Sequence, residues 1–145
     1  MTFKTFTISA LIASTLMAAP ALAGHSGNTV ILDQYGWDNS MGGAQSGSFN
    51  RMRVYQDGWG NTSISTQDGA FNRTAVGQVG IGNYSDTSQA GAGNLTGVAQ
   101  IGNGNTAETE QNGFNNAVGV IQIGDGNNVS TTQNGSGNVA VIIQD

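Results

Sequence analysis

Apolar and polar positions alternate along this chain in short segments that each end at a glutamine. The residues two and four positions before each glutamine are never charged. The charged residues of these segments lie one, three or five positions before the glutamine. One of the uncharged positions holds an aliphatic residue every 22 residues: Val54, Val76, Val98, Val120 and Ile142. A period of two places alternate side chains on opposite faces of a strand, and charge avoids a buried face. The pattern predicts half-buried β-strands whose glutamine face points inward.

The strands belong to a repeat of eleven residues. It begins at a glutamine: Gln34, Gln45, Gln56, Gln67, Gln78, Gln89, Gln100, Gln111, Gln122, Gln133 and Gln144. A glycine follows two residues after each of the first ten: Gly36, Gly47, Gly58, Gly69, Gly80, Gly91, Gly102, Gly113, Gly124 and Gly135. An asparagine follows five residues after each of the same ten: Asn39, Asn50, Asn61, Asn72, Asn83, Asn94, Asn105, Asn116, Asn127 and Asn138. One fixed period indicates a small unit stacked on itself.

The unit is predicted to be a strand and a corner. An eleven-residue period also fits a right-handed helical coiled coil, but the glycine, asparagine and β-branched residues of each unit disfavour helix. Gly-x-x-Asn is expected to form the corner, because glycine adopts positive φ and asparagine tolerates it. The five residues before the next glutamine are expected to form a strand of ~17 Å.

The expected fold class is all-β, a two-sheet β-solenoid. Because the aliphatic position returns every 22 residues, the rung is strand-turn-strand. Rungs stack in parallel and in register, as in cross-β amyloid. Alternate strands then form a sheet of six and a sheet of five, the larger one ending at Gln34, Gln56, Gln78, Gln100, Gln122 and Gln144.

The glutamine and asparagine columns are candidates for a self-assembly ladder. At a rung spacing of ~4.8 Å, each side-chain amide can donate to the copy on one side and accept from the copy on the other. A buried amide without its partner is penalised, so the ladder also enforces register. The aliphatic column is expected to form the core.

The N-terminus and the composition indicate export and argue against several functions. Residues 1–23 are predicted to be a secretory signal peptide, with Lys4 before an apolar stretch and Ala21-Leu22-Ala23 at the cleavage site. Residues 24–33 are then a short N-terminal segment, and residues 34–145 are the repeat domain of ten units and five rungs. Three arginines against nine acidic residues argue against a nucleic-acid partner. With no cysteine and only His25, we expect no catalytic residue, metal site or cofactor, and no small-molecule substrate.

Several units resemble the curlin repeat, S-x5-Q-x-G-x-G-N-x-A-x3-Q, of secreted bacterial functional-amyloid subunits. The units with the best match begin at Gln78, Gln89, Gln100, Gln122 and Gln133. The resemblance covers residues 34–144. It implies extracellular, cell-surface curli fibres that serve in biofilm matrix and cell adhesion. It also implies two partners, an outer-membrane secretion pore and a minor nucleator subunit.

The two edges of the stack favour a head-to-tail homopolymer. The segment 139–145 is apolar on both faces and the segment 29–34 is a similar edge, and neither carries a cap. The regular repeats and uncharged final strand favour the major fibre subunit over the nucleator. A soluble solenoid that binds ice or glycan is the other alternative, but its outward positions are mixed: Ser40, Thr62, Tyr84, Thr106 and Asn128.

Two questions stay open at the level of sequence. Eleven strands leave a gap at a subunit junction, unless residues 29–34 are not a strand in the fibre or neighbouring subunits overlap. Like charges also stack one rung apart, Arg51 with Arg73 and Asp86 with Glu108. They act either as gatekeepers against premature assembly or simply as solubilising groups.

Overall fold

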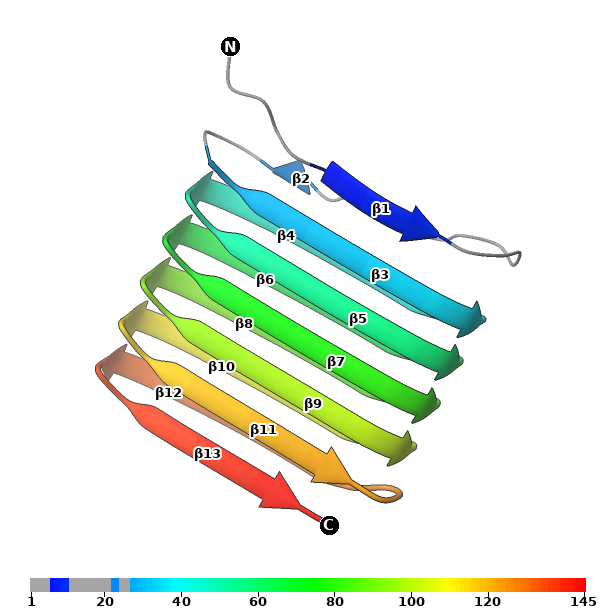
Figure 1. Cartoon of the computed structure of the whole chain (residues 1–145). Helices are drawn as coiled ribbons and strands as arrows, with labels where there is room; N and C mark the ends of the chain where they lie inside the picture. The colour runs from blue at the N-terminus through cyan, green and yellow to red at the C-terminus, as the bar shows by residue number, and fades with distance from the viewer. Residues whose placement is uncertain (1–5, 11–21, 24–26) are drawn as a thin grey trace.

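The computed structural model describes residues 6–10, 22–23 and 27–145, all of them in strands or connecting corners (Figure 1). Two strands precede the repeat, β1 (Phe6–Ala10) and β2 (Leu22–Ala23). The repeat itself forms eleven strands: β3 (Thr29–Trp37), β4 (Ser40–Ser48), β5 (Arg51–Trp59), β6 (Thr62–Ala70), β7 (Arg73–Ile81), β8 (Tyr84–Ala92), β9 (Leu95–Asn103), β10 (Thr106–Phe114), β11 (Ala117–Ile123), β12 (Asn128–Ser136) and β13 (Val139–Gln144).

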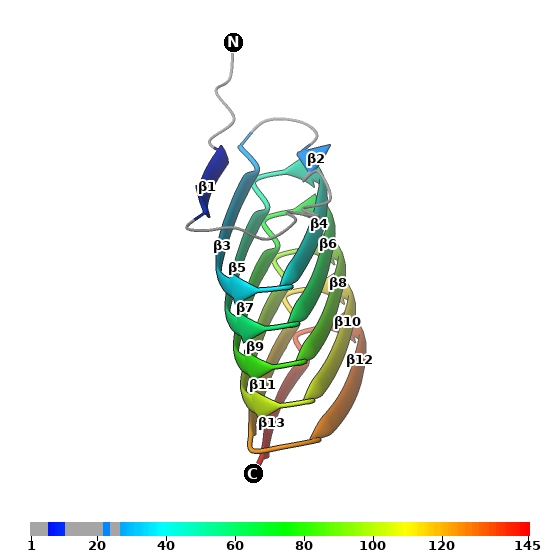
Figure 2. The same cartoon turned by 90° about the vertical axis from the view of Figure 1, so that its right-hand side faces the viewer.

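The strands form two parallel sheets that face each other, which confirms the predicted two-sheet β-solenoid. The seven-stranded sheet has the order β1-β3-β5-β7-β9-β11-β13, and the six-stranded sheet has the order β12-β10-β8-β6-β4-β2. Figure 2 shows the two layers edge-on, with the corners joining them. Without β1 and β2, the repeat contributes the predicted six strands to one sheet and five to the other.

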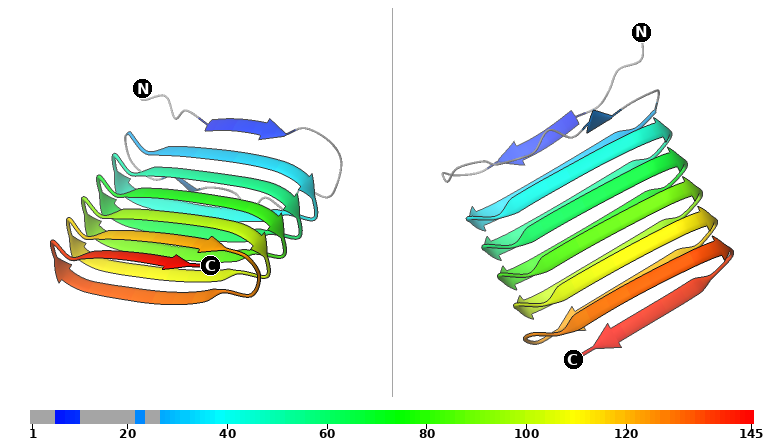
Figure 3. Two further views of the ribbon diagram at one scale, coloured as in Figure 1. Left: turned by 60° about the horizontal axis from the view of Figure 1, so that its bottom comes forward. Right: turned by 180° about the vertical axis from the view of Figure 1, so that it is seen from behind.

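Register is constant through the repeat. From β3 to β13, each paired residue lies opposite the residue 22 positions later, as Gln56 does with Gln78 and Val54 with Val76, whereas β1 pairs with β3 at an offset of 24 residues. Identical positions therefore form straight columns along the stacking axis, and successive rungs run parallel to one another in both views of Figure 3. A slip by one residue would turn every inward side chain outward.

The predicted strand length is wrong. Most strands of the repeat have nine residues rather than five, and they run on past the glutamine and its glycine, as β7 does from Arg73 to Ile81. The glycine has positive φ, 124° at Gly80, yet it keeps its in-register partners on both neighbouring rungs. Pairing therefore continues through the glycine, and the corner shrinks to the two residues before the next strand, such as Gly82 and Asn83.

Strands β1 and β2 extend the N-terminal edge of the stack. β1 pairs with β3 and β2 pairs with β4. Both lie in the predicted signal peptide, most of which is outside the described residues, as is the predicted new N-terminus at Gly24. That processing stays a prediction. The boundary expected between residues 33 and 34 falls inside β3, which is a continuous strand.

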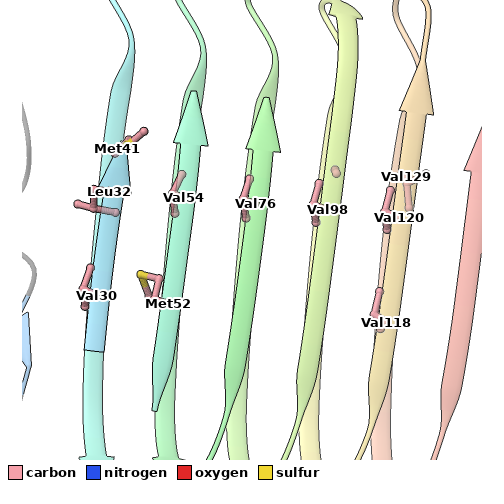
Figure 4. Close-up of a cluster of buried hydrophobic side chains, with 11 residues drawn as sticks. Val30, Leu32, Met41, Met52, Val54, Val76, Val98, Val118, Val120 and Val129 are labelled. Carbon is pink, nitrogen blue, oxygen red and sulfur yellow. The ribbon is translucent and has the colours of Figure 1, made fainter. Parts of the chain in front are cut away.

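The core is a narrow seam between the sheets. Its buried apolar side chains include Val54, Val76, Val98 and Val120, which are 0–4% exposed and stand in one column on the seven-stranded sheet (Figure 4). The facing positions of the six-stranded sheet are mostly small and polar, such as Ser65 and Thr87, which form a hydrogen bond of 2.7 Å. Large and small side chains thus face each other across the seam.

Candidate self-assembly site

The glutamines form two continuous hydrogen-bonded ladders inside the stack. In each step the Nε2 of one glutamine donates to the Oε1 of the glutamine 22 residues later, at 2.7 Å from Gln56 to Gln78 and 2.8 Å from Gln78 to Gln100. All nine steps between Gln34 and Gln144 are present, at 2.6–3.0 Å. Nine of the eleven glutamines are buried, and only Gln34 and Gln144 are partly exposed.

The same amides also tie the two sheets together. The second Nε2 hydrogen of Gln78 bonds to the carbonyl of Thr62, which opens a strand of the opposite sheet, at 3.0 Å. Gln100 and Gln122 repeat this contact with Tyr84 and Thr106. The sequence predicted the stacking but not this link, because it depends on how the corner folds back over the seam. Each glutamine therefore satisfies its amide in two directions.

The asparagines secure the corners. The Oδ1 of Asn61 accepts the backbone N–H of Asn83 at 3.0 Å, and its Nδ2 donates to the carbonyl of Gly80 at 3.0 Å. Equivalent bonds recur from rung to rung, and the asparagines from Asn50 to Asn116 are buried. The asparagine ladder thus bonds each corner to the next rung through both backbone and side chain.

The glycines of the motif allow the rungs to approach closely. A Cβ atom placed on Gly80 would overlap the carbonyl oxygen of Gly102, and the same clash with the next rung recurs from Gly36 to Gly113. At Gly135 the nearest heavy atom would be 3.6 Å away, because no described rung follows it. The glycine columns therefore act by excluding a side chain as well as by adopting positive φ.

We expect Gln89→Met to destabilise the fold, because it breaks a ladder at mid-stack. Gln89 Oε1 accepts from Gln67 at 2.8 Å, and its Nε2 donates to Gln111 at 2.9 Å. Methionine fills the space but removes both ladder bonds, so Gln67 Nε2 keeps only its bonds to the Arg51 carbonyl and Thr74 Oγ1, and Gln111 Oε1 keeps only its bond from Thr96 Oγ1. Two lost buried hydrogen bonds cost roughly 1–3 kcal/mol in total. The loss is measured as a lower urea midpoint. The matched control is Asn134→Ala on the exposed face, which should change stability by less than about 0.5 kcal/mol.

The two outer faces differ in charge. Arg51, Arg53 and Arg73 lie on the seven-stranded sheet, where Arg53 pairs with Asp33 at 3.8 Å. Asp86 and Glu108 are paired in register on the six-stranded sheet. Partial burial raises the pKa of Asp86, the nearby Glu108 carboxylate raises it further, and a hydrogen bond from Tyr84 opposes them. Stacked like charges are therefore unfavourable in this fold, as at the paired positions of any sheet.

We expect Asp86→Asn to stabilise the protein at pH 7 and to have no such effect at about pH 3. The folded-state pKa of Asp86 is raised, so the folded state holds its proton more tightly than the unfolded state does. Stability is then highest below the unfolded value of ~3.9 and falls as pH rises through the folded value. Urea midpoints at both pH values measure the effect. The control is Asp68→Asn, since its rung neighbours Ser46 and Ala90 are uncharged; an equal gain there would contradict the stacked-charge explanation.

Both ends of the stack can offer a strand edge to another chain. At the C-terminal end this edge belongs to β13, and at the N-terminal end β3 and β4 are covered, in the described part of the chain, only by β1 and β2, which lie in the predicted signal peptide. β13 pairs only with β11 among the described strands. Its outward side chains Val139, Val141 and Ile143 are 67–74% exposed. Inward, Ala140 and Ile142 pack only partly against the core. An apolar edge strand of this kind is a template for another strand.

The described residues contain no group of three or more His, Cys, Asp or Glu side chains placed to hold a metal ion. No helix long and apolar enough to cross a membrane occurs in the described part of the chain. The structure thus brings together the ladder amides, the corner glycines and the core aliphatics, and these form one continuous feature along the axis.

Comparison with known proteins identifies one relationship. The family model of the curlin associated repeat matches residues 102–130, which run from the end of β9 through β10 and β11 into β12. No curated protein and no solved structure matches the chain. Over residues 102–130 the chain is therefore similar to the curlin associated repeat.

Proposed function

We propose that this chain is a structural subunit that assembles itself into extracellular amyloid fibres of the curli type. The observation that carries the proposal is the unbroken register of the rungs, in which every ladder can continue past the edge strand β13. A second copy added there would gain main-chain hydrogen bonds, two amide ladders and burial of aliphatic side chains at once. The similarity to the curlin associated repeat supports the same function. It also supports biofilm matrix and cell adhesion as the setting, with a nucleator subunit and a secretion pore as partners.

Fibre formation is the direct test. The chain is purified in denaturant, released into buffer, and followed by negative-stain microscopy and fibre diffraction. We expect unbranched fibres with reflections at ~4.7 Å along the axis and ~10 Å across it. A chain that stays monomeric for days, while circular dichroism shows a folded β protein, would rule the proposal out.

Within a fibre, we propose that this chain is the major subunit. The final strand has no charged side chain from Val139 to Gln144, and the ladders run without interruption through the eleven strands of the repeat. Both features suit a unit that adds repeatedly to its own kind. Deletion of the gene distinguishes the roles: loss of nearly all fibre mass supports the major subunit, whereas secretion of unpolymerised fibre protein would indicate a nucleator.

A further inference from the structure

The outermost strands of the repeat, β3 and β13, lie in the same sheet. Consecutive strands of the repeat alternate between the two sheets, and each 22-residue rung adds one strand to each sheet. The step from one strand to the next therefore approximates a half turn about the stacking axis with a rise of half a rung. After β13, the next such step leads to the six-stranded sheet, beside β12. The open end is therefore staggered: β13 ends the seven-stranded sheet and lies beyond β12, which ends the six-stranded sheet (Figure 1).

We propose that the second copy of this chain docks on this end turned by a half turn about the stacking axis. Its β3 then lies beside β12 of the first copy, and its β4 lies beside β13. Successive subunits alternate between two orientations, and both sheets continue without a gap. This inference rests on the proposed function, since it specifies the junction through which the fibre would grow.

An unpartnered buried acceptor supports this orientation. Gln45 is 3% exposed, and its Oε1 has no hydrogen-bond partner among the residues that the structure describes. The residue paired with it on the preceding strand is Ala23, which has no amide. In the half-turn junction, Gln144 of the first copy occupies that place. Within the described residues the Gln144 side chain accepts a bond from Gln122 at 3.0 Å. Every inner glutamine of the ladder donates its Nε2 to the next rung, so the same polarity makes Gln144 Nε2 the donor that Gln45 Oε1 requires.

The corners of the two copies match as well. The Asn116 side chain donates to the carbonyl of Gly135 on the next rung at 2.9 Å. The Asn138 side chain donates to the Asn134 carbonyl at 3.1 Å and to Asn116 Oδ1 at 3.1 Å, and among the described residues it reaches no glycine carbonyl of a following rung. The half-turn junction places Gly36 of the second copy on Gly135, where its carbonyl can accept from Asn138. The space left open at Gly135 is then filled as it is at every inner glycine of the column.

Simple translation of the second copy gives a poorer junction. β3 would then lie beside β13, and the other sheet would lack one strand between β12 and β4. β12 and β4 would then lie two strand spacings apart, each of ~4.8 Å. Gln45 Oε1 would have no donor, and Gln133 Nε2 would have no glutamine on the next rung to donate to. The half-turn junction thus accommodates the odd number of strands in the repeat. Neighbouring subunits do not have to overlap, and β3 remains a strand.

Paired cysteines distinguish the two junctions, since the chain has no cysteine of its own. Ile143, Ala44 and Asp33 each lie one residue before a ladder glutamine on the outer face. The half-turn junction pairs Ile143 with Ala44 of the next copy, whereas translation pairs it with Asp33. In-register neighbours are ~4.8 Å apart, within the Cα range of a disulfide.

The variants Ile143→Cys/Ala44→Cys and Ile143→Cys/Asp33→Cys are expressed from the full 145-residue sequence. Protein is taken from the exported fraction, because β1 and β2 pair with β3 and β4 until residues 1–23 are removed. Mass spectrometry verifies the N-terminus. Ile121→Cys/Ile143→Cys is the folding control, since these residues pair within one chain and should form an internal disulfide. A second position, Val141→Cys with Gly42→Cys or with Ile31→Cys, repeats the comparison without the Asp33 ion pair.

We expect oxidised assemblies of the Ile143→Cys/Ala44→Cys variant to give a ladder of covalent multimers on a non-reducing gel. The Ile143→Cys/Asp33→Cys variant should give at least about tenfold less covalent multimer, because in the half-turn junction its cysteines lie on opposite outer faces. The reverse result overturns the half turn but leaves the proposed function intact, since copies still stack. Fibres without cross-links in either pair also overturn it. If the folding control forms its disulfide and no variant forms fibres, the proposed function itself fails.

Discussion

Val76→Asp is expected to abolish the ordered solenoid at neutral pH. Val76 is 3% exposed and is paired with Val54 and Val98 in the core column. An ionised carboxylate there would have no cation within the seam, and burial shifts of three to five pKa units correspond to roughly 4–7 kcal/mol. That is comparable with the whole stability of a typical domain, about 5–15 kcal/mol. Circular dichroism, thermal unfolding and fibre yield measure the loss.

The matched control is Ala75→Asp, one residue away on the exposed face. Its in-register neighbours are Arg53 and Gly97, so the new carboxylate has water and a cation beside it. We expect nearly normal stability and fibre formation. The Val76 variant should also regain order as pH falls below about 4, because protonation removes the buried charge and its folded pKa is raised. If Val76→Asp folded as well as its control at pH 7, the dry seam would not exist.

Gly80→Ala is expected to have the second largest effect. The φ of Gly80 is 124°, and an added Cβ would overlap the carbonyl oxygen of Gly102 on the next rung. The rungs would have to separate at that point of the strand, which weakens the ladder bonds nearby. Backbone strain and overpacking together cost roughly 2–6 kcal/mol. Urea unfolding of the monomer and the rate of fibre growth measure the effect.

Gly82→Ala separates steric exclusion from backbone conformation. Gly82 also has positive φ, 64°, but a Cβ there would meet no atom within 4 Å. We expect a cost of about 1–2 kcal/mol from left-handed geometry alone. Four units already tolerate other residues at this place, with φ of 54–58° at Asp38, Phe49, Phe71 and Asn115. Equal losses at Gly80 and Gly82 would mean that close approach of the rungs does not explain the glycine column.

The contrast between these two glycines shows where sequence reasoning succeeded and where it stopped. Both were expected to serve as turn residues. Their spacing could not reveal that Gly80 lies within a strand and against another backbone, because that contact joins residues 22 positions apart. The predicted strands were too short for the same reason. Positive φ was taken as the end of the strand, although in-register pairing continues through it.

The alternation of residues such as Val76 with their exposed neighbours, together with the eleven-residue period, was sufficient to predict two parallel sheets and an inward glutamine face. Those properties depend on which face of a strand each side chain occupies. The spacing of residues along the sequence determines that face, because successive side chains of a strand point to opposite sides. The cross-sheet bonds of Gln78, the unpartnered acceptor on Gln45 and the staggered end at β13 required three-dimensional placement. Each depends on the path of a corner or on which strand lies next to which, and these relations arise only when the rungs are stacked.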